Sequence, residues 1–359
     1  MRSRAALETT RSVSLARLLP APTLARLPSG LKRMRELHHA STPDELAFLT
    51  QEIWGGECAA ESASSASSSA SAAAYGLSRL QPGDVFVDVG ANVGLASLYA
   101  AERVRARNGS RPGMIVALEP LPRTHAALRA NFAAFLRGGE GDADDDASAG
   151  LELTLLPMAA VEHAQTTEVE MTVWPRAAGW ATVAGDGDDG TLVADMLVFL
   201  RSHVRQIASG DAAAPASGSR ALASLADALA RASPPLFDAA ARLYVSRALL
   251  SGAQQVRCAA APLSSVFPPE GREVALLKVD VEGSEVAALR GVAREDWPRV
   301  RRVVVEASSA AGGGEGDTSS NVDAVVRLLR EAGGFGDRVR VSQAPALVGT
   351  SLFLVEAER

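Results

Sequence analysis

The sequence predicts an α/β fold: a seven-stranded, mostly parallel sheet with helices on both faces, plus a helical insertion. Three observations lead to this prediction. A buried strand, a glycine turn and a helix start follow one another within residues 82–98. Short apolar runs rich in β-branched residues then alternate with stretches of helical periodicity, as in a parallel sheet covered on both faces. Residues 186–252 interrupt this alternation, which resumes after them.

The first half of the chain supplies three strands of the predicted sheet. Apolar runs predict strands at 85–89, 114–118 and 151–156, with helical patterns between them at 95–105 and 124–136. A separate stretch, 167–174, alternates between apolar and polar side chains and predicts a strand at an exposed edge.

The second half supplies four more strands after the insertion. Within residues 186–252, helical patterns cover 191–206, 220–231 and 235–251. We expect this insertion to form a lid over the binding crevice or a small helical subdomain. The sheet pattern then resumes, with strands predicted at 274–279, 303–305, 338–342 and 351–355 and helices at 284–290 and 322–332.

The N-terminal residues 1–26 are expected to be a basic tail or an organellar transit peptide. Four arginines stand against the single acid Glu8 in the first 24 residues, with Ser and Thr between them. This composition suits a transit peptide as well as a disordered tail, so the location stays open between the cytoplasm and an organelle. We assign residues 27–359 to the folded domain, with an Ala/Ser-rich insertion at 59–74.

The composition argues against several classes of protein. The net charge of −6 disfavours a nucleic-acid partner, which would require a basic face. Cys58 and Cys258 are too few for a disulfide framework or a cysteine zinc site. The alternating aspartates at 142–146 lack the glycine and glutamate of a calcium loop, so no metal site is predicted. No uncharged apolar run reaches the length of a membrane span.

The glycine turn after the first strand predicts a nucleotide-type binding site. Glycines let a ligand approach the backbone, and the free N–H groups of the following helix face it. Asp88 stands where dinucleotide-binding proteins keep a glycine, and its carboxylate would repel a pyrophosphate. A cationic ligand without phosphate, such as S-adenosylmethionine, fits better. The cofactor-binding candidates in this turn are Asp88, Gly90, Ala91, Asn92 and Gly94.

A second carboxylate, Glu119, follows the second predicted strand. In a doubly wound sheet, that strand ends at the same crevice as the first. A carboxylate there can accept hydrogen bonds from both hydroxyls of an adenosine ribose. Glu119 is therefore a cofactor-binding candidate, and Pro120 and Ala159 complete the set.

Two acids end the strand after the insertion. Asp280 and Glu282 lie where the next helix begins, and acids in such a place are costly unless they bind or catalyse something. We expect them to orient an attacking group or to take its proton. They are the catalytic candidates.

The two strongest motifs resemble those of one family. Asp-Val-Gly-Ala-Asn-Val-Gly at 88–94 resembles the first motif of class I methyltransferases, and of the FkbM family in particular. Leu-Lys-Val-Asp-Val-Glu-Gly at 277–283 is similar to a second FkbM motif, and Glu-Pro-Leu-Pro at 119–122 to another. This resemblance implies a class I methyltransferase (Rossmann-like) fold and S-adenosylmethionine as the cofactor.

A narrower resemblance links the chain to FkbM domains associated with nonribosomal peptide synthetases. It rests on Asp-Trp-Pro-Arg at 296–299, on Val-Val-Val-Glu at 303–306, and on Gly-Thr at 349–350. Such relatives often carry Glu-Val-His-Asp where this chain reads Glu-Ala-Ser-Ser at 306–309. A histidine that acts in those relatives would be missing here.

The resemblance implies methyl transfer from S-adenosylmethionine, and we expect the acceptor atom to be a hydroxyl oxygen. The acceptor could be a small molecule, a glycan, a lipid or a peptide. Two alternatives stay open. One is a binding module that keeps the cofactor crevice without turnover. The other is a nicotinamide-dependent oxidoreductase on a related sheet, against which Asp88 argues.

Overall fold

The computed structural model describes the greater part of the chain. The Ala/Ser-rich stretch 59–74 and the aspartates at 142–146 lie outside the described residues. The described residues are 11–19, 21–40, 42–50, 53–54, 57–58, 75–106, 110–137, 150–183, 189–209, 219–309, 320–343 and 348–359.

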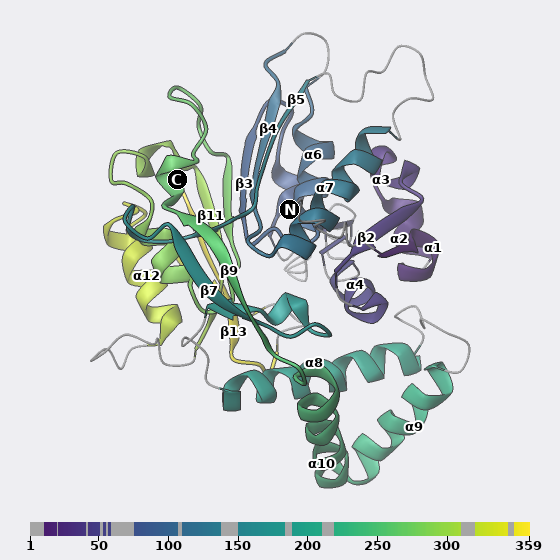
Figure 1. Ribbon diagram of the computed structural model, residues 1–359. Coiled ribbons are helices and arrows are strands. Elements are labelled where there is room, and N and C mark those ends of the chain that lie inside the picture. The colour runs from purple at the N-terminus through teal and green to yellow at the C-terminus, as the bar shows by residue number, and fades with distance from the viewer. Residues whose placement is uncertain are drawn as a thin grey trace, which may run out of the picture.

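The centre of the molecule is a seven-stranded sheet in the order β12-β13-β11-β10-β3-β4-β5 (Figure 1). Neighbours are parallel except around β13, which runs antiparallel to both β11 and β12. The predicted α/β class and seven-stranded sheet are confirmed. The strands are β3 (Val85–Val89), β4 (Gly113–Leu118), β5 (Leu151–Leu156), β10 (Leu276–Val279), β11 (Arg302–Ser308), β12 (Val339–Ser342) and β13 (Leu352–Glu358).

Each face of the sheet buries its own apolar cluster. Because side chains alternate along a strand, Phe86 of β3 faces one cluster while Val87 and Val89 face the other. The first cluster lies under α6 (Leu95–Val104) and α7 (Pro122–Arg137). The second lies under α11 (Glu285–Arg290) and α12 (Asn321–Glu331). Helices therefore cover both faces, as predicted.

The N-terminal elements pack onto the first of these faces. They include residues that we expected in a tail: Leu15, Leu18 and Leu19 are buried in the α6–α7 cluster. Strands β1 and β2 pair antiparallel. The described residues between 11 and 26 therefore form part of the packed layer in this structure. The elements are β1 (Arg11–Ser14), α1 (Leu15–Leu18), α2 (Ala21–Arg26), α3 (Ser29–Arg33), β2 (Glu36–His39) and α4 (Pro43–Thr50).

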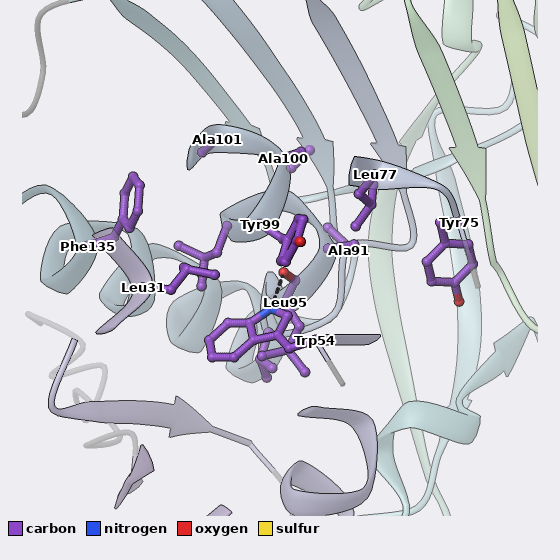
Figure 2. Close-up of a cluster of buried hydrophobic side chains, with 14 of the residues drawn as sticks. Leu31, Trp54, Tyr75, Leu77, Ala91, Leu95, Tyr99, Ala100, Ala101 and Phe135 are labelled. Carbon is purple, nitrogen blue, oxygen red and sulfur yellow. Dashed lines mark hydrogen bonds between the residues drawn. The ribbon is translucent and has the colours of Figure 1, made fainter. Parts of the chain in front are cut away.

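A buried amide fixes this N-terminal layer to the glycine turn. Asn131 of α7 donates from Nδ2 to the carbonyl oxygens of Val93, at 2.8 Å, and of His38, at 3.0 Å. Its Oδ1 accepts from the backbone N–H of His38 at 2.7 Å. Trp54 adds a further link, since its Nε1 donates to the carbonyl oxygen of Leu95 at 2.9 Å (Figure 2). The turn is thus held from the N-terminal side.

A second sheet stands beside the first, in the order β6-β9-β7-β8. The stretch that we expected to be an edge strand forms β7, which lies between β9 and β8 inside this smaller sheet. Strand β9 was not predicted, because its first residues are polar and its last ones are alanines. The strands are β6 (Met158–Ala160), β7 (Glu168–Val173), β8 (Thr182–Val183) and β9 (Gln254–Ala261).

The insertion forms helices, as its periodicity predicts. They are α8 (Asp189–Ser209), α9 (Ser219–Ala232) and α10 (Pro234–Tyr244), followed by the π-helical turn η4 (Val245–Leu249). They share a small core around Phe237 and Val245 that also includes Trp174 and Ala177, and α9 and α10 project away from the sheet (Figure 1). Among the described residues, every helix is too short or too polar to span a bilayer.

Candidate functional site

A cleft opens where β3, β4, β10 and β11 end. It has a volume of about 1360 Å³ including its open mouth, and the turns that follow these parallel strands line it. In open α/β sheets, ligands bind outside the carboxyl ends of the strands. The cleft therefore lies where the fold predicts a ligand site.

The glycine turn forms one side of the cleft and cannot accept larger residues. Gly90 has a φ of +79°, and a Cβ there would lie 1.8 Å from the carbonyl oxygen of Asp280. Gly94 has a φ of +91°, and its Cβ would lie 2.5 Å from Leu128. Gly90 needs glycine on two grounds, the left-handed backbone and the Asp280 carbonyl in its way, whereas Gly94 needs it for its left-handed backbone. The two glycines let the turn pack closely against Asp280 and α7, while Gly90, Ala91 and Asn92 line the cleft.

Asp88 is fully buried and does not line the cleft. Its Oδ1 lies 3.1 Å from Nζ of Lys278, and its Oδ2 accepts from Oγ of Ser97 at 2.6 Å. The pairing follows from the sheet, because Lys278 is the parallel partner of Asp88 in register. We expected direct contact between this carboxylate and a cationic ligand. In the structure, Asp88 instead forms an ion pair with Lys278 beneath the glycine turn.

Lys278 is a buried cation with three acceptors. Besides Asp88, Nζ lies 3.3 Å from Oδ2 of Asp280 and donates to the carbonyl oxygen of Gly90 at 3.3 Å. Burial alone would lower the pKa of Lys278, but the charges of Asp88 and Asp280 outweigh burial and raise that pKa. The ammonium therefore stays charged and ties β3 to β10.

Glu119 lines the cleft beside the glycine turn. Its carboxylate accepts from the backbone N–H of Asn92 at 3.0 Å and of Leu121 at 2.9 Å. Burial raises the pKa of Glu119 to about 7, and the nearby charge of Asp88 adds to this effect, although the two N–H donors oppose it. The Glu119 carboxyl therefore titrates near neutral pH, and it does so at the lining of the cleft.

A cluster of acids forms the floor of the cleft. Asp280 and Glu282 follow β10, and Glu306 lies near the end of β11. Glu282 has a φ of +51°, and its carbonyl oxygen accepts from Oγ1 of Thr182 at 2.8 Å. Burial raises the pKa of Glu282 well above its usual range, and repulsion from Asp280 and Glu306 adds to the rise. Glu282 thus holds its proton to higher pH than a solvated glutamate does.

The neighbouring acid Glu285 stabilises the turn after β10 through hydrogen bonds. It is buried, and its carboxylate accepts from the N–H of Gly283 at 2.8 Å and from the side chain of Asn321. These bonds fix the tight turn that carries Glu282. Glu285 therefore supports the floor without lining the cleft.

The walls of the cleft are apolar. Leu49 of α4 and Ile53 line one wall. Trp180 and Phe199 line another, with their rings edge-to-face and 5.2 Å between centroids. Phe199 is the one described residue of the insertion that lines the cleft. The insertion thus reaches the site through α8, and its other helices fit the small helical subdomain that we expected as the alternative to a lid.

Most of the candidates from the sequence meet in this cleft. Eight of them line it, and Asp88 and Gly94 lie behind the lining. Sequence reasoning missed Tyr75, Lys278 and Glu306 as site residues. Lys278 could have been found, since it stands two residues before Asp280 and so shares its strand face. The eight are Gly90, Ala91, Asn92, Glu119, Pro120, Ala159, Asp280 and Glu282.

Residues 88–334 match the family described as the methyltransferase FkbM domain. The chain belongs to the FkbM methyltransferase family. It is 28% identical over 336 residues to the 31-O-demethyl-FK506 methyltransferase FkbM of Streptomyces tacrolimicus, a match that covers 93% of this chain and 96% of that protein. The family assignment makes this chain a methyltransferase that uses S-adenosylmethionine, and it excludes the nicotinamide-dependent oxidoreductase.

Two further relatives match shorter parts of their own length. The chain is 27% identical over 282 residues to the AMB antimetabolite synthetase AmbE of Pseudomonas aeruginosa, covering 78% of this chain and 11% of that protein. It is 52% identical over 46 residues to the methyltransferase sdnD of Sordaria araneosa, covering 12% of this chain and 18% of that protein.

The cleft fits S-adenosylmethionine on features of its own. Gly90, Ala91 and Asn92 of the glycine turn line it, so an adenosyl ligand can lie against them. Glu119 presents a carboxylate of the kind that ribose hydroxyls bind. The acids of the floor suit a ligand that carries positive charge.

Proposed function

We propose that this FkbM-family methyltransferase moves the methyl group of S-adenosylmethionine to a hydroxyl oxygen of its acceptor. The observation that carries the proposal is the placement of Asp280 and Glu282 in the same cleft as the glycine turn. The relative from Streptomyces tacrolimicus supports oxygen as the acceptor atom, because its name describes an O-methyl transfer and the match spans nearly the whole chain.

The cofactor would be held by the glycine turn and by the residues that face it. Glu119 would accept the ribose hydroxyls, and Asp88 would act from below by fixing Lys278. Bound there, the cofactor supplies an electrophilic methyl group on a sulfonium. Gly94 would keep the turn closed against α7. The remaining contacts would come from Gly90, Ala91, Asn92, Pro120 and Ala159.

Asp280 is the proposed hydrogen-bond acceptor for the attacking hydroxyl. Its Oδ2 is engaged by Lys278, and its side chain is 25% exposed in the cleft. The raised pKa of Glu282 makes it hold a proton to higher pH than a solvated glutamate, and in that form it would donate a hydrogen bond there. It could serve as a base only once the pH rises through that raised pKa.

The residue that stands in place of the relatives' histidine supports this division of roles. Oγ of Ser308 lies 2.7 Å from Oγ of Ser351, and Asp195 of α8 accepts from the N–H and hydroxyl of Ser351. The hydrogen bonds through Ser308 and Ser351 link the insertion to the sheet, and a serine at position 308 supplies no imidazole base. Proton acceptance would therefore fall to the carboxylates of the floor.

We also propose a closer kinship with FkbM domains associated with nonribosomal peptide synthetases. Two features support it: the Asp-Trp-Pro-Arg and Gly-Thr motifs, and the match to a short part of the much longer antimetabolite synthetase. On this proposal the acceptor would be a hydroxylated small molecule or peptide. Glycans and lipids with hydroxyl groups belong in the same test.

The experiment that tests the function uses cofactor labelled in its methyl group. The protein is mixed with panels of hydroxylated macrolides, peptides, glycans and lipids, and labelled products are identified by mass spectrometry. We expect a methyl ether on at least one panel member, with Asp280→Asn lowering its formation by about a hundredfold. A protein that binds the cofactor and labels no acceptor would instead be a binding module.

A further inference from the structure

We infer that Tyr75 is a positioning residue for Asp280: its phenol and Lys278 together hold one carboxylate oxygen of Asp280, so that the other faces the acceptor. The inference deepens the proposed function and rests on it. Tyr75 has no role in the motifs of the sequence, because it stands before the first strand and far from β10 along the chain.

The contacts converge on a single oxygen atom. The hydroxyl of Tyr75 donates to Oδ2 of Asp280 at 3.2 Å, and Nζ of Lys278 lies 3.3 Å from the same Oδ2. The ammonium also lies 5.0 Å from the centroid of the Tyr75 ring, which is a favourable cation–π distance. Phenol, ammonium and carboxylate therefore form one compact unit.

The other oxygen of Asp280 is left for a ligand. Within the described residues, Oδ1 of Asp280 has no hydrogen-bond or ionic partner, although the side chain lines the cleft. A carboxylate clamped through one oxygen has a fixed plane, and the direction of its second oxygen is fixed with it. Such pre-orientation is what an in-line reaction requires of the group that receives the hydroxyl.

Tyr75 also joins Asp280 to a third acid. Its hydroxyl lies 3.3 Å from Oε2 of Glu306, and a phenol has one proton to give. The hydroxyl therefore donates to either Asp280 or Glu306 at one time, while the ammonium of Lys278 stays ion-paired with Asp280 in both cases. Tyr75 thus links two acids that line the same cleft.

The fold does not depend on this hydroxyl. Arg302 donates from Nη2 to the carbonyl oxygens of Tyr75 and Gly76, at 3.2 and 2.6 Å. Glu57 accepts from the next two backbone N–H groups, at 2.8 and 2.9 Å. In Figure 2, Tyr75 lies at the edge of the apolar cluster, with its hydroxyl oxygen pointing away from Leu77. Tyr75→Phe should therefore remove the hydroxyl and keep the ring in place.

Kinetics of Tyr75→Phe provide the first test. We expect kcat to fall about ten- to a hundredfold, as for loss of a hydrogen bond to a charged group, with the Kd for S-adenosylmethionine within about twofold of wild type. Tyr99→Phe is the matched control, since Tyr99 is buried in the same cluster and does not line the cleft. An unchanged kcat in Tyr75→Phe would overturn the inference.

A second measurement is independent of any acceptor. The chain has three tyrosines, so labelling their ζ carbons gives a simple NMR spectrum, in which Tyr75→Phe identifies the Tyr75 signal. We expect Asp280→Asn to shift that signal and to leave those of Tyr99 and Tyr244 in place. A Tyr75 signal that ignores Asp280→Asn would refute the link between the two side chains. A shifted signal in a protein that methylates no acceptor would uphold the link and reject the proposed transfer.

Discussion

Glu119 connects burial to a measurable dependence on pH. Its pKa of about 7 means that the folded protein without ligand keeps a proton on this carboxyl below neutral pH. Ribose hydroxyls bind an ionised carboxylate better than a neutral carboxyl. The proposed contact with the cofactor therefore favours the form that exists at higher pH.

We predict that S-adenosylmethionine binds about tenfold more tightly at about pH 8 than at about pH 6, and that binding releases a proton in this range. Titration calorimetry in two buffers with different heats of ionisation measures both quantities. The ammonium of the cofactor titrates equally in all variants, so Glu119→Gln isolates the protein's contribution. Equal slopes for wild type and Glu119→Gln would show that Glu119 does not meet the cofactor.

Lys278 allows a prediction about stability. Removing one partner of a buried ion pair leaves an uncompensated charge, at a cost of about 3–5 kcal/mol. We expect Lys278→Met to lower the free energy of unfolding by this amount, because Asp88 is fully buried. Urea denaturation provides the measurement. The double variant Lys278→Met with Asp88→Asn should recover part of the loss; a double variant that loses the sum of both single effects would contradict the pairing.

Some site residues could be predicted from the sequence, for a simple reason. Glu119, Asp280 and Glu282 follow apolar strands, and the ends of parallel strands meet at one edge of the sheet. The burial of Asp88 could not be predicted, because it depends on the register between β3 and β10. Tyr75 could not be found either, since its contact with Asp280 spans 205 residues and no local pattern marks it.

At the scale of elements, α8 is the part of the insertion that reaches the cleft. Asp195 fastens it to Ser351 beside the end of the sheet, and Phe199 lies one turn further along the helix. Helices α9 and α10 show large apolar side chains to solvent instead, including Leu225, which is 69% exposed. The insertion therefore has one face toward the site and another away from it.

We predict that Phe199→Ala raises the KM for the acceptor by about tenfold or more, because a buried aromatic surface is worth about 1.5–3 kcal/mol. The Kd for S-adenosylmethionine should not change. Steady-state kinetics with the acceptor found in the panel measure the first quantity, and calorimetry the second. Leu225→Ala on α9 is the control and should behave as wild type. A KM that is the same in both variants would remove α8 from the acceptor site.

Periodicity predicted the elements better than their placement. The helices of the insertion and the strands of the main sheet were found because their patterns span several turns or form compact apolar runs. The partners of β7 could not be known, since the alternation of a strand does not say which sheet it joins. Strand β9 lacks the β-branched and aromatic side chains that mark a strand.

At the scale of the whole molecule, we propose that the folded domain includes the described residues between 11 and 26 and does not start at residue 27. The described N-terminal elements share a core with α6 and α7, and they supply three fully packed leucines. Composition could not reveal this, because arginines and serines on the outer face of a packed layer look like those of a tail.

We predict that Leu18→Ala lowers the free energy of unfolding by about 2–5 kcal/mol, as usual for a buried leucine. Leu18 is 2% exposed, whereas Leu243 of α10 is 59% exposed. Leu243→Ala should therefore change stability by less than about 0.5 kcal/mol. Chemical denaturation of both variants distinguishes a packed layer from an independent tail, for which Leu18→Ala would be neutral.

Asn131 connects the proposed cofactor site to strand β2, so that cofactor binding should be detectable in that strand. Its amide joins Val93 in the glycine turn to the backbone of His38 in β2. A ligand that reduces the motion of the glycine turn should also reduce the motion of β2, because the side chain of Asn131 is hydrogen-bonded to both. The backbone amide proton of His38 should therefore report whether the cofactor site is occupied. Its exchange with deuterium should slow when S-adenosylmethionine is added, and this slowing should be absent in Asn131→Ala.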